Sequence, residues 1–190
     1  MQVNSLFSAN GKLLDGLKLI KPDLRKDDRG FFMESWNRNS ISEAGLGDIN
    51  FVQDNHSLSS KGVFRGFHYQ LPPHQQLKLV RCISGQIFDI VIDIRRESTS
   101  FGDWVGVHLT SSNFNQLWVP EGFAHGFLTL SEQAEVLYKV TNYWDKSAER
   151  TISWKDPSLL IKFPFNGSFE LSQKDNDAPF LSELEDNDLF

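Results

Sequence analysis

The segment from Gly62 to Lys78 contains the densest group of residues that could do chemistry. It reads GVFRGFHYQLPPHQQLK and places four functional side chains among apolar residues: Arg65, His68, Tyr69 and Lys78. Charged groups this close to an apolar core are costly to bury unless they meet partners or a ligand. An arginine can hold a phosphate, a histidine can carry a proton, and a lysine can stabilise an oxyanion. Together these side chains indicate chemistry on an anionic substrate.

Three further candidates lie downstream, and each admits a structural interpretation beside a functional one. Alternation within residues 136–141 places Tyr138 on the face that carries two valines, so its hydroxyl is expected to be buried and to need a partner. His125 lies in the glycine- and aromatic-rich segment 120–127, where it can bind a substrate or bond a neighbouring backbone group. Asp175 is ordinarily a surface acid, but a carboxylate can also orient a histidine for proton transfer.

The cationic candidates also have simpler interpretations. A lysine that opens a strand, as Lys78 does, can protect a sheet edge from aggregation. Arg29, in the turn before two phenylalanines, by itself reads as a solvent-facing residue. A lone strand histidine is more often structural than catalytic, but the arginine and lysine near His68 favour a functional role for it.

Arg65 and His68 can share one pocket only if the strand that carries them is irregular. Strict alternation places Phe64 and His68 on one face of the strand and Arg65 on the other. Gly66 lies between them, and a glycine is the residue at which a bulge or twist costs least. The sequence therefore predicts a bulge at Gly66.

The elements that must position these residues are short strands. Apolar runs broken by turns extend from Gly62 to Asp156, a pattern typical of a β-sandwich or barrel. The run before Ser84-Gly85 and the run after it predict a hairpin. The expected strands in this region are 78–83, 86–93, 104–109, 115–119, 126–130, 136–143 and 151–154.

The two ends of the chain give weaker signals. Residues 17–37 predict two strands around a turn at 26–30, and residues 39–44 predict a helix that ends at the glycines after it. The acidic segment 181–190 predicts a short helix or a tail whose charges are solvated.

Composition fits a single β-rich domain spanning 1–190. A chain of 190 residues can bury a core without disulfides or metals, and its 16 phenylalanines and 5 tryptophans favour strands. The net charge of −6 argues against non-specific binding to nucleic acid or to an anionic membrane, but a locally basic pocket can still bind an anion.

Cysteine content and hydropathy predict a cytoplasmic protein. Cys82 is the single cysteine, which excludes an internal disulfide and is interpreted as a small core residue. Residues 1–20 lack the continuous apolar run of a signal peptide. No later stretch approaches the roughly 20 apolar residues needed to span a membrane.

Several other classes of active site are disfavoured by missing motifs. His68, His74 and His125 are possible metal ligands, but the His-x-His pair with a following Glu that metal-binding small barrels usually carry is absent, so no metal is expected. The chain also has no Walker-type phosphate loop, no G-x-G-x-x-G and no Gly-x-Ser-x-Gly.

Long motifs across the chain resemble one enzyme family, the dTDP-4-dehydrorhamnose 3,5-epimerases. The resemblance covers about residues 15–180 and implies a cupin-type jelly-roll β-barrel with a few short helices. The motifs that carry it, in order, are DDRGFFMESWN (27–37), FVQDNHSLSSKGVFRGFHYQLPPHQQLKLVRCISGQIFDIVIDIR (51–95), FGDWVGVHL (101–109), QLWVPEGFAHGF (116–127), YKVTNYW (138–144) and LSQKD (171–175).

The resemblance implies a role for each matching residue. His68 matches the general base, Asp175 the acid that orients it, Tyr138 the general acid, and Lys78 the lysine that stabilises the enolate. The substrate-binding positions that it implies are Arg29, Glu34, Gln53, Asp54, Asn55, Arg65, His125, Trp144, Glu149 and Lys174. Among these, Arg65 and Lys174 match diphosphate contacts.

Three residues depart from the family pattern. Trp144 stands where a tyrosine commonly stacks on the thymine; it keeps a stacking face and removes a hydroxyl. Phe64 and Phe67 replace leucines, an apolar exchange that should leave the chemistry unchanged.

The implied substrate is dTDP-4-dehydro-6-deoxy-D-glucose, epimerised at carbons 3 and 5 to dTDP-4-dehydro-L-rhamnose in dTDP-L-rhamnose biosynthesis. The ketone makes the neighbouring C–H bonds acidic, so no metal or organic cofactor is expected. The alternatives are a related dTDP-keto-sugar epimerase that acts at one carbon only, a metal-dependent cupin enzyme, and a jelly-roll module that binds sugar without catalysis.

The resemblance also implies an assembly. It predicts a homodimer in which an N-terminal arm, about 1–50, brings Arg29 and Glu34 to the site of the second subunit. A C-terminal tail is expected at about 176–190.

Overall fold

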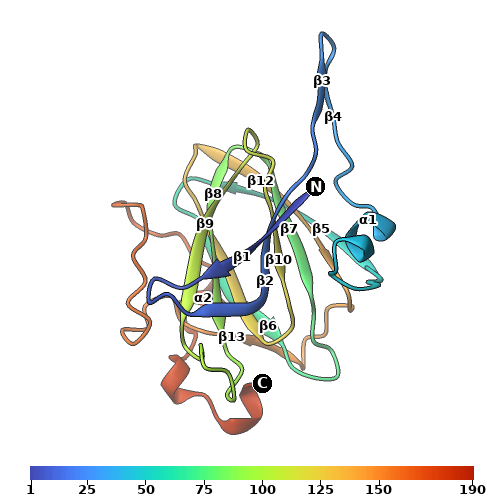
Figure 1. Ribbon diagram of the computed structural model, residues 1–190. Helices are drawn as coiled ribbons and strands as arrows, with labels where there is room; N and C mark the ends of the chain where they lie inside the picture. Colours follow the sequence, from blue (N-terminus) through green and yellow to red (C-terminus); the bar gives the residue numbers. More distant parts are fainter.

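Two antiparallel sheets face each other and form a jelly-roll barrel in the computed structural model, which describes residues 1–190 (Figure 1). One sheet has the strand order β1 (Gln2–Phe7), β2 (Leu13–Lys21), β10 (Gln116–Val119), β7 (Lys78–Ser84), β12 (Gln133–Val140), β5 (Gln53–Ser60). The other has the order β13 (Glu149–Thr151), β6 (Phe64–Gln70), β11 (Phe123–Thr129), β8 (Gln86–Asp93), β9 (Trp104–Thr110). The mainly-β, jelly-roll prediction is confirmed.

Helices are few and short. They are α1 (Arg38–Glu43), α2 (Gln173–Asn176) and two 3₁₀ turns, η1 (Leu181–Glu183) and η2 (Asp186–Asp188). The helix predicted at 39–44 is α1, and Asn37 caps it by accepting hydrogen bonds from the backbone N–H groups of Asn39 and Ser40. No helix in the structure has the length and hydropathy needed to cross a membrane.

The hairpin predicted around Ser84-Gly85 is wrong. Both strands exist, but β7 pairs with β10 and β12 in the six-stranded sheet, whereas β8 pairs with β11 and β9 in the other. Gly85 has a φ of +75°, and a Cβ there would lie 2.1 Å from the carbonyl oxygen of Gln133. The turn thus carries the chain from one sheet to the other. A short turn between two apolar runs does not by itself tell whether the two strands pair with each other or enter different sheets.

Strand assignment at the N-terminal end was also incomplete. The turn near residues 26–30 is present, between β3 (Arg25–Asp27) and β4 (Gly30–Phe32), but most of the first predicted strand belongs to the long β2. β1 and β5 were not predicted, because both are polar edge strands of the sheet. The β3–β4 hairpin projects from the barrel (Figure 1), and its tip leaves the side chains of Phe31 and Phe32 exposed.

Two cores lie on opposite faces of the five-stranded sheet. Inside the barrel, Val80, Val91, Leu109 and Leu117 pack with their neighbours into one cluster of 13 buried residues. On the outer face, a second cluster of 13 buried residues contains phenylalanines and isoleucines of β6 and β8. Alternation along β8 separates them, since Ile87 and Val91 face inward whereas Phe88, Ile90 and Ile92 face outward.

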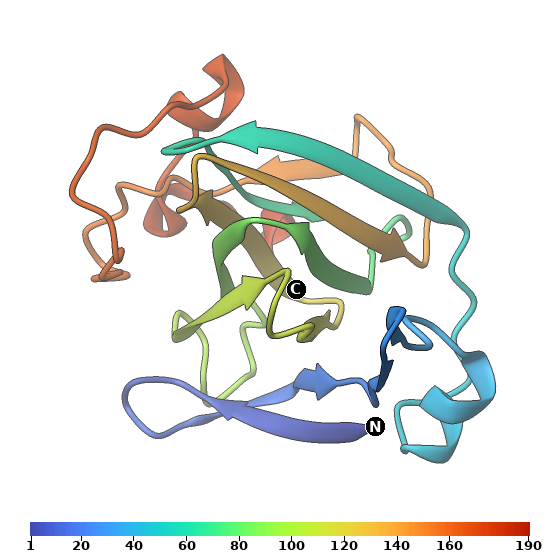
Figure 2. The same cartoon turned by 90° about the horizontal axis from the view of Figure 1, so that it is seen from above.

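The C-terminal segment covers the outer face rather than forming a solvated tail. The N-terminal strands and α1 lie on one side of the barrel and the C-terminal segment on the opposite side (Figure 2). Leu181 is buried there, Asp188 pairs with Arg150 at 2.5 Å, and the backbone N–H of Phe190 bonds the carbonyl of Ile94. The expectation of solvated charges holds for Asp186, which is 87% exposed, and fails for Asp188, which is 27% exposed.

Candidate active site

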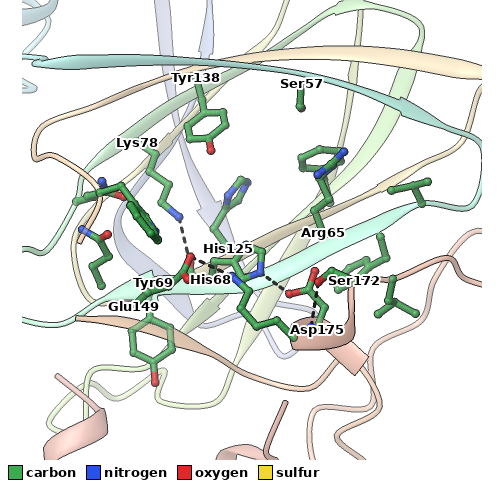
Figure 3. A pocket seen from close by; sticks show the side chains of 18 of the residues that line it. Ser57, Arg65, His68, Tyr69, Lys78, His125, Tyr138, Glu149, Ser172 and Asp175 are labelled. Carbon is green, nitrogen blue, oxygen red and sulfur yellow. Dashed lines mark hydrogen bonds and ion pairs between the residues drawn. The ribbon is translucent and has the colours of Figure 1, made fainter. Parts of the chain in front are cut away.

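A cavity of about 740 Å³ lies between the two sheets and α2. Strands β6, β7, β11, β12 and β13 all contribute side chains to its wall, and α2 contributes Lys174 and Asp175. Figure 3 shows Tyr138 and Lys78 on one side of this space and His68 with Asp175 on the other. The residues singled out in the Gly62–Lys78 segment thus meet partners that come from distant parts of the chain.

His68 and Asp175 form a hydrogen-bonded pair on the cavity wall. Nε2 of His68 lies 2.6 Å from Oδ1 of Asp175, whose side chain is only 4% exposed. Burial lowers the pKa of His68 from its ordinary value, although the bond to Asp175 works in the opposite direction. Although burial alone would raise the pKa of Asp175, its bonds from His68 and Ser172 hold that pKa below its usual range. The pair is therefore a neutral imidazole held by a carboxylate.

Ser172 helps to place Asp175. Its side chain caps the short helix α2 and accepts a hydrogen bond from the backbone N–H of Asp175 at 3.2 Å. The first turn of α2 is thereby fixed with the Asp175 side chain turned toward β6. The sequence-based prediction that Asp175 could orient a histidine agrees with this geometry.

The predicted bulge at Gly66 is present. His68 is opposite His125, and Arg65 is opposite Phe127, so two residues of β6 (Gly66 and Phe67) face the single Gly126 of β11. A Cβ on Gly66 would lie 2.5 Å from Cα of Gly126, and its φ is +141°. The bulge brings Arg65 and His68 to the same cavity.

Tyr69 lies in the same segment as Arg65 and His68, but its hydroxyl points away from their side chains (Figure 3). Its hydroxyl donates to the backbone carbonyl of Asp188 at 2.6 Å, and its ring belongs to the outer cluster. Tyr69 thus anchors the C-terminal segment, because the alternation that resumes after the bulge turns it away from His68.

Lys78 is a buried member of the wall and not an edge lysine, because β7 lies between β10 and β12. Its ammonium donates to the backbone carbonyl of His68 at 3.0 Å. Burial lowers the pKa of Lys78 to about 8, against the opposing effect of the Asp89 and Glu149 charges. Such an ammonium can stabilise a developing oxyanion because little water competes with it.

Tyr138 faces the cavity from β12, in the sheet opposite His68 (Figure 3). The predicted inward phase of this strand is confirmed, since Val136 and Val140 are fully buried on the same face. Burial raises the pKa of Tyr138, while the nearby Arg65 lowers it in part. The phenol therefore stays protonated at neutral pH and can act as a proton donor.

His125 lies next to His68 across the β6–β11 pair and has its own carboxylate. Its Nε2 is 2.8 Å from Oδ1 of Asp89, a fully buried residue of β8. Both interpretations offered by the sequence, a substrate contact or a bond to a backbone group, missed this partner. The signal for it was an aspartate that interrupts the apolar run 86–93.

Basic and acidic side chains share the remaining wall. Arg65 donates from Nε to Oγ of Ser59 at 3.0 Å. Lys174 forms an ion pair with Glu149 at 3.0 Å. Ser57, Gln70, Gln76 and Glu170 also line the cavity; they were not singled out, because isolated polar residues carry no distinctive pattern.

Trp144 lies at the cavity mouth, where its side chain is largely exposed. Its backbone N–H bonds Oε1 of Gln53 at 3.2 Å, and Nε2 of Gln53 bonds Oδ1 of Asn55 at 2.8 Å. Asp54 points to the other face of β5 and pairs with Lys139, outside the cavity. Strand alternation turns Asp54 outward, and none of residues 53–55 is among those that line the cavity, so their roles in binding substrate stay predictions.

Arg29 and Glu34 also lie outside this cavity. Arg29 is at the tip of the β3–β4 hairpin, where it pairs with Asp27 at 2.5 Å, and Glu34 accepts a hydrogen bond from Asn37. One chain alone does not bring them to His68. No three His, Cys, Asp or Glu side chains are arranged to hold a metal ion, and His74 is instead near Asp145.

The chain is similar in sequence to a family of known enzymes. Residues 12–183 match the family model described as dTDP-4-dehydrorhamnose 3,5-epimerase. The dTDP-4-dehydrorhamnose 3,5-epimerase of Salmonella typhimurium is 52% identical over 165 residues, which cover 87% of this chain and 90% of that protein. The chain belongs to the dTDP-4-dehydrorhamnose 3,5-epimerase family.

Solved structures agree with this family assignment. The dTDP-6-deoxy-D-glucose-3,5-epimerase of Legionella pneumophila, in complex with dTDP-4-keto-L-rhamnose, superposes with a TM-score of 0.91 at 41% identity, covering 99% of this chain and 97% of that one. A dTDP-4-dehydrorhamnose 3-epimerase from Streptomyces niveus is 34% identical, covering 93% of this chain and 84% of that protein. As a member of the 3,5-epimerase family, the protein is an isomerase, and the matched region spans every predicted site residue from Arg29 to Asp175.

Proposed function

We propose that this member of the 3,5-epimerase family inverts carbons 3 and 5 of dTDP-4-dehydro-6-deoxy-D-glucose and yields dTDP-4-dehydro-L-rhamnose. The observation that best supports this reaction is the placement of a proposed base and a proposed acid on opposite walls of one cavity. His68, held by Asp175, faces Tyr138 across the space, and the ammonium of Lys78 extends from the wall that carries Tyr138 to the backbone carbonyl of His68 (Figure 3). An inversion needs that opposition, because the proton must leave one face of the carbon and return to the other.

His68 would act first. The neutral imidazole removes the proton from a carbon beside the ketone, and the C–H electrons form an enolate whose oxygen carries the negative charge. Asp175 stabilises the imidazolium that results. The ammonium of Lys78 interacts more strongly with the enolate than with the neutral ketone, so it lowers the barrier.

Tyr138 would complete the inversion. Its phenol donates a proton to the opposite face of the same carbon, and the enolate electrons return to re-form the ketone. His68 is left protonated and Tyr138 ionised, and proton exchange with water restores both groups. The same cycle at the second carbon gives the doubly inverted sugar.

Cationic groups would hold the diphosphate. Arg65 and Lys174 line the cavity, and the ion pair of Lys174 with Glu149 must loosen when phosphate oxygens approach. Trp144 at the mouth offers a flat face on which thymine can stack. Gln53 and Asn55 support that rim through their hydrogen bonds.

The assembly that we propose is a cytoplasmic homodimer. The β3–β4 hairpin extends away from its own barrel and carries exposed Phe31 and Phe32, together with Arg29. Exposed aromatic side chains on a projecting arm suit insertion against a second copy. That arrangement would bring Arg29 and Glu34 to the cavity of the other subunit. Within this assembly, residues 1–190 act as one jelly-roll domain.

A deuterium experiment tests the proposed reaction. The protein is incubated with dTDP-4-keto-6-deoxyglucose in D₂O, and the sugar is examined by NMR. Deuterium at carbons 3 and 5 is the expected result. Addition of a partner reductase and NADPH should then yield dTDP-L-rhamnose.

The same experiment separates the alternatives. Deuterium at one carbon would identify a mono-epimerase, the activity named for the Streptomyces niveus relative. Loss of exchange in a metal chelator would favour a metal-dependent enzyme. Absence of exchange with intact nucleotide binding would favour a module that binds without catalysis.

A further inference from the structure

Asp89 is a fully buried aspartate on the inward face of β8, and the proposed proton transfers do not use it. Its Oδ1 accepts a hydrogen bond from Nε2 of His125 at 2.8 Å, whereas its Oδ2 is buried without any hydrogen-bond partner. Burying a carboxylate with half of its bonding capacity unused costs free energy. An unsatisfied buried group of this kind calls for a reason beyond packing.

Asp93, four residues later on the same strand, shows what a structural aspartate looks like in this fold. It is also fully buried, but it accepts bonds from Arg95, Ser98 and Ser100 and forms an ion pair with Arg95 at 2.7 Å. These partners hold the pKa of Asp93 below its usual range against the effect of burial. Asp89 has no such set of donors, so fewer groups of the protein bond to its carboxylate.

The bond from His125 fixes the state of that imidazole. An ionised carboxylate can only accept a hydrogen bond, so Nε2 of His125 must carry the hydrogen that it shares with Asp89. In a neutral imidazole the other nitrogen, Nδ1, is then an acceptor. Nδ1 of His125 makes no hydrogen bond within the protein, and the residue lines the cavity. It is therefore free to accept a hydrogen bond from a sugar hydroxyl.

The two imidazoles of the cavity are arranged alike. His125 and His68 are opposite each other across β11 and β6, and each bonds an aspartate through Nε2. One aspartate comes from α2 and the other from β8, so the two pairs are held by independent elements. The proposed base is thus accompanied by a second oriented imidazole in the same wall.

Asp89 also influences Lys78. The ammonium of Lys78 has no acidic partner within ion-pair distance, and its one hydrogen bond goes to a neutral backbone carbonyl. Asp89 is the strongest influence that raises the pKa of Lys78 against burial, followed by Glu149, while Lys174 lowers it. The other titratable groups that line the cavity around Lys78 are Arg65, His68 and Tyr69 from β6, His125 from β11, Tyr138 from β12, Glu170, and Asp175 from α2.

We propose that Asp89 is a positioning residue for the epimerisation, which holds His125 with its hydrogen on Nε2. It acts through His125 without touching the substrate. The inference rests on the proposed function for its kinetic consequences, but the state of His125 can be measured without any substrate.

The first experiment therefore uses the unaltered protein. Long-range ¹H–¹⁵N NMR of ring-labelled histidines distinguishes the two neutral tautomers, and His125→Gln identifies the signal by its disappearance. We expect a hydrogen on Nε2 of His125. A hydrogen on Nδ1 alone would overturn the proposal, whatever the protein does to the sugar.

The second experiment uses Asp89→Asn, which keeps the shape and removes the charge. Its amide can present an N–H to His125 and thereby favour the opposite tautomer. We expect kcat/KM for epimerisation to fall about 10–100-fold, by analogy with the removal of a carboxylate that orients a metal-bound imidazole. The high-pH limb of kcat/KM should move to lower pH, because Lys78 loses a charge that supports its protonated form.

Asp93→Asn is the matched control, because it removes an equally buried charge from the same strand. It should lower the melting temperature and leave the tautomer of His125, the high-pH limb and kcat/KM of the folded protein unchanged. Wild-type values of all three in Asp89→Asn would overturn the proposal. If deuterium exchange were absent in the wild-type protein, the proposed function would fail, while the NMR result would still decide the tautomer.

Discussion

The two faces of the five-stranded sheet differ in what they do with the same strands. The outer face of β6, β8 and β11 packs phenylalanines and isoleucines under the C-terminal segment, and Phe64 and Phe67 lie there with ring centroids 5.2 Å apart. The inner face of the same strands presents Arg65, His68 and His125 to a cavity. The outer face is therefore wholly apolar, whereas the inner face combines an apolar cluster with charged groups that are costly to bury. The bulge at Gly66 allows both, because it changes the phase of β6 between Arg65 and His68.

Replacing the proposed base should give the largest effect of any single change. His68→Ala removes the imidazole from the inner face, and general base catalysis contributes about 10²–10⁴-fold to rates of this kind. We expect at least that loss in the exchange of solvent deuterium into the keto sugar, with little change in the melting temperature. Asp175→Asn should give a smaller loss, because the imidazole remains and only its orientation is disturbed.

Near-normal deuterium exchange in His68→Ala would contradict its assignment as the base. A large fall in melting temperature would contradict the comparison of the two faces, since it would show that His68 itself stabilises the fold.

Removal of a buried ring from the outer face should do the opposite. Phe67 is fully buried and packs in the outer cluster. Phe67→Ala should lower the free energy of unfolding by about 3–5 kcal/mol, measured by urea denaturation. Phe67→Leu is the matched control, since it keeps an apolar side chain in the site and should cost much less.

The folded fraction of Phe67→Ala should retain most of its deuterium exchange activity. A loss of activity greater than the loss of folded protein would show that the ring of Phe67 positions the bulge. The outer face would then contribute to catalysis as well as to stability.

Sequence reasoning was more successful for the inner face than for the connections between strands. The inner residues are charged or polar within apolar runs, so Arg65, His68, Lys78 and Tyr138 could be recognised, and the inward phase of Tyr138 could be predicted. The bulge at Gly66 followed from alternation together with the hypothesis that Arg65 and His68 share one pocket. The roles themselves came from resemblance to a family, because residue types do not state which sugar is bound.

What the sequence could not provide was pairing between distant segments. The turn at Ser84-Gly85 suits a hairpin, yet β7 and β8 enter different sheets, since pairing depends on the neighbours that each strand finds across the barrel. Asp89 was overlooked for the same reason, because its partner His125 is 36 residues away. Asp54 was assigned to the site although alternation on β5 turns it outward.

Trp144 lies at the cavity mouth, where the inner face ends. Its replacement tests whether this end of the face binds the nucleotide. Its side chain is largely exposed, so its replacement should barely affect stability. If it stacks on thymine, Trp144→Ala should weaken binding of dTDP by about 1–3 kcal/mol, measured by calorimetry. Trp144→Tyr, which restores the residue more familiar in the family, should retain most of the affinity. Equal affinity in all three proteins would show that the mouth contributes no stacking.

The smallest expected effect is on stability. It measures the free-energy cost of burying the charge of Lys78 on the inner face. Burial lowers the pKa of Lys78 to about 8, whereas an unfolded lysine has a pKa near about 10.4. Between these values the unfolded chain binds more protons than the folded one, so stability should rise as the pH increases through this window. The catalytic ammonium is lost over the same range, and kcat/KM should therefore fall above pH about 8.

Lys78→Met keeps the length of the side chain and removes the buried charge. At pH 7 we expect epimerisation to fall about 10²–10³-fold, the loss typical of removing one group that stabilises an oxyanion. The free energy of unfolding should rise by about 1–2 kcal/mol, the gain that often follows when an active-site compromise is removed. The variant should also lose the part of the pH dependence of stability that lies above pH 8. A destabilised variant would mean that the hydrogen bond from Lys78 to the carbonyl of His68 outweighs the cost of burying the charge, and Lys78 would then support the fold as well as the chemistry.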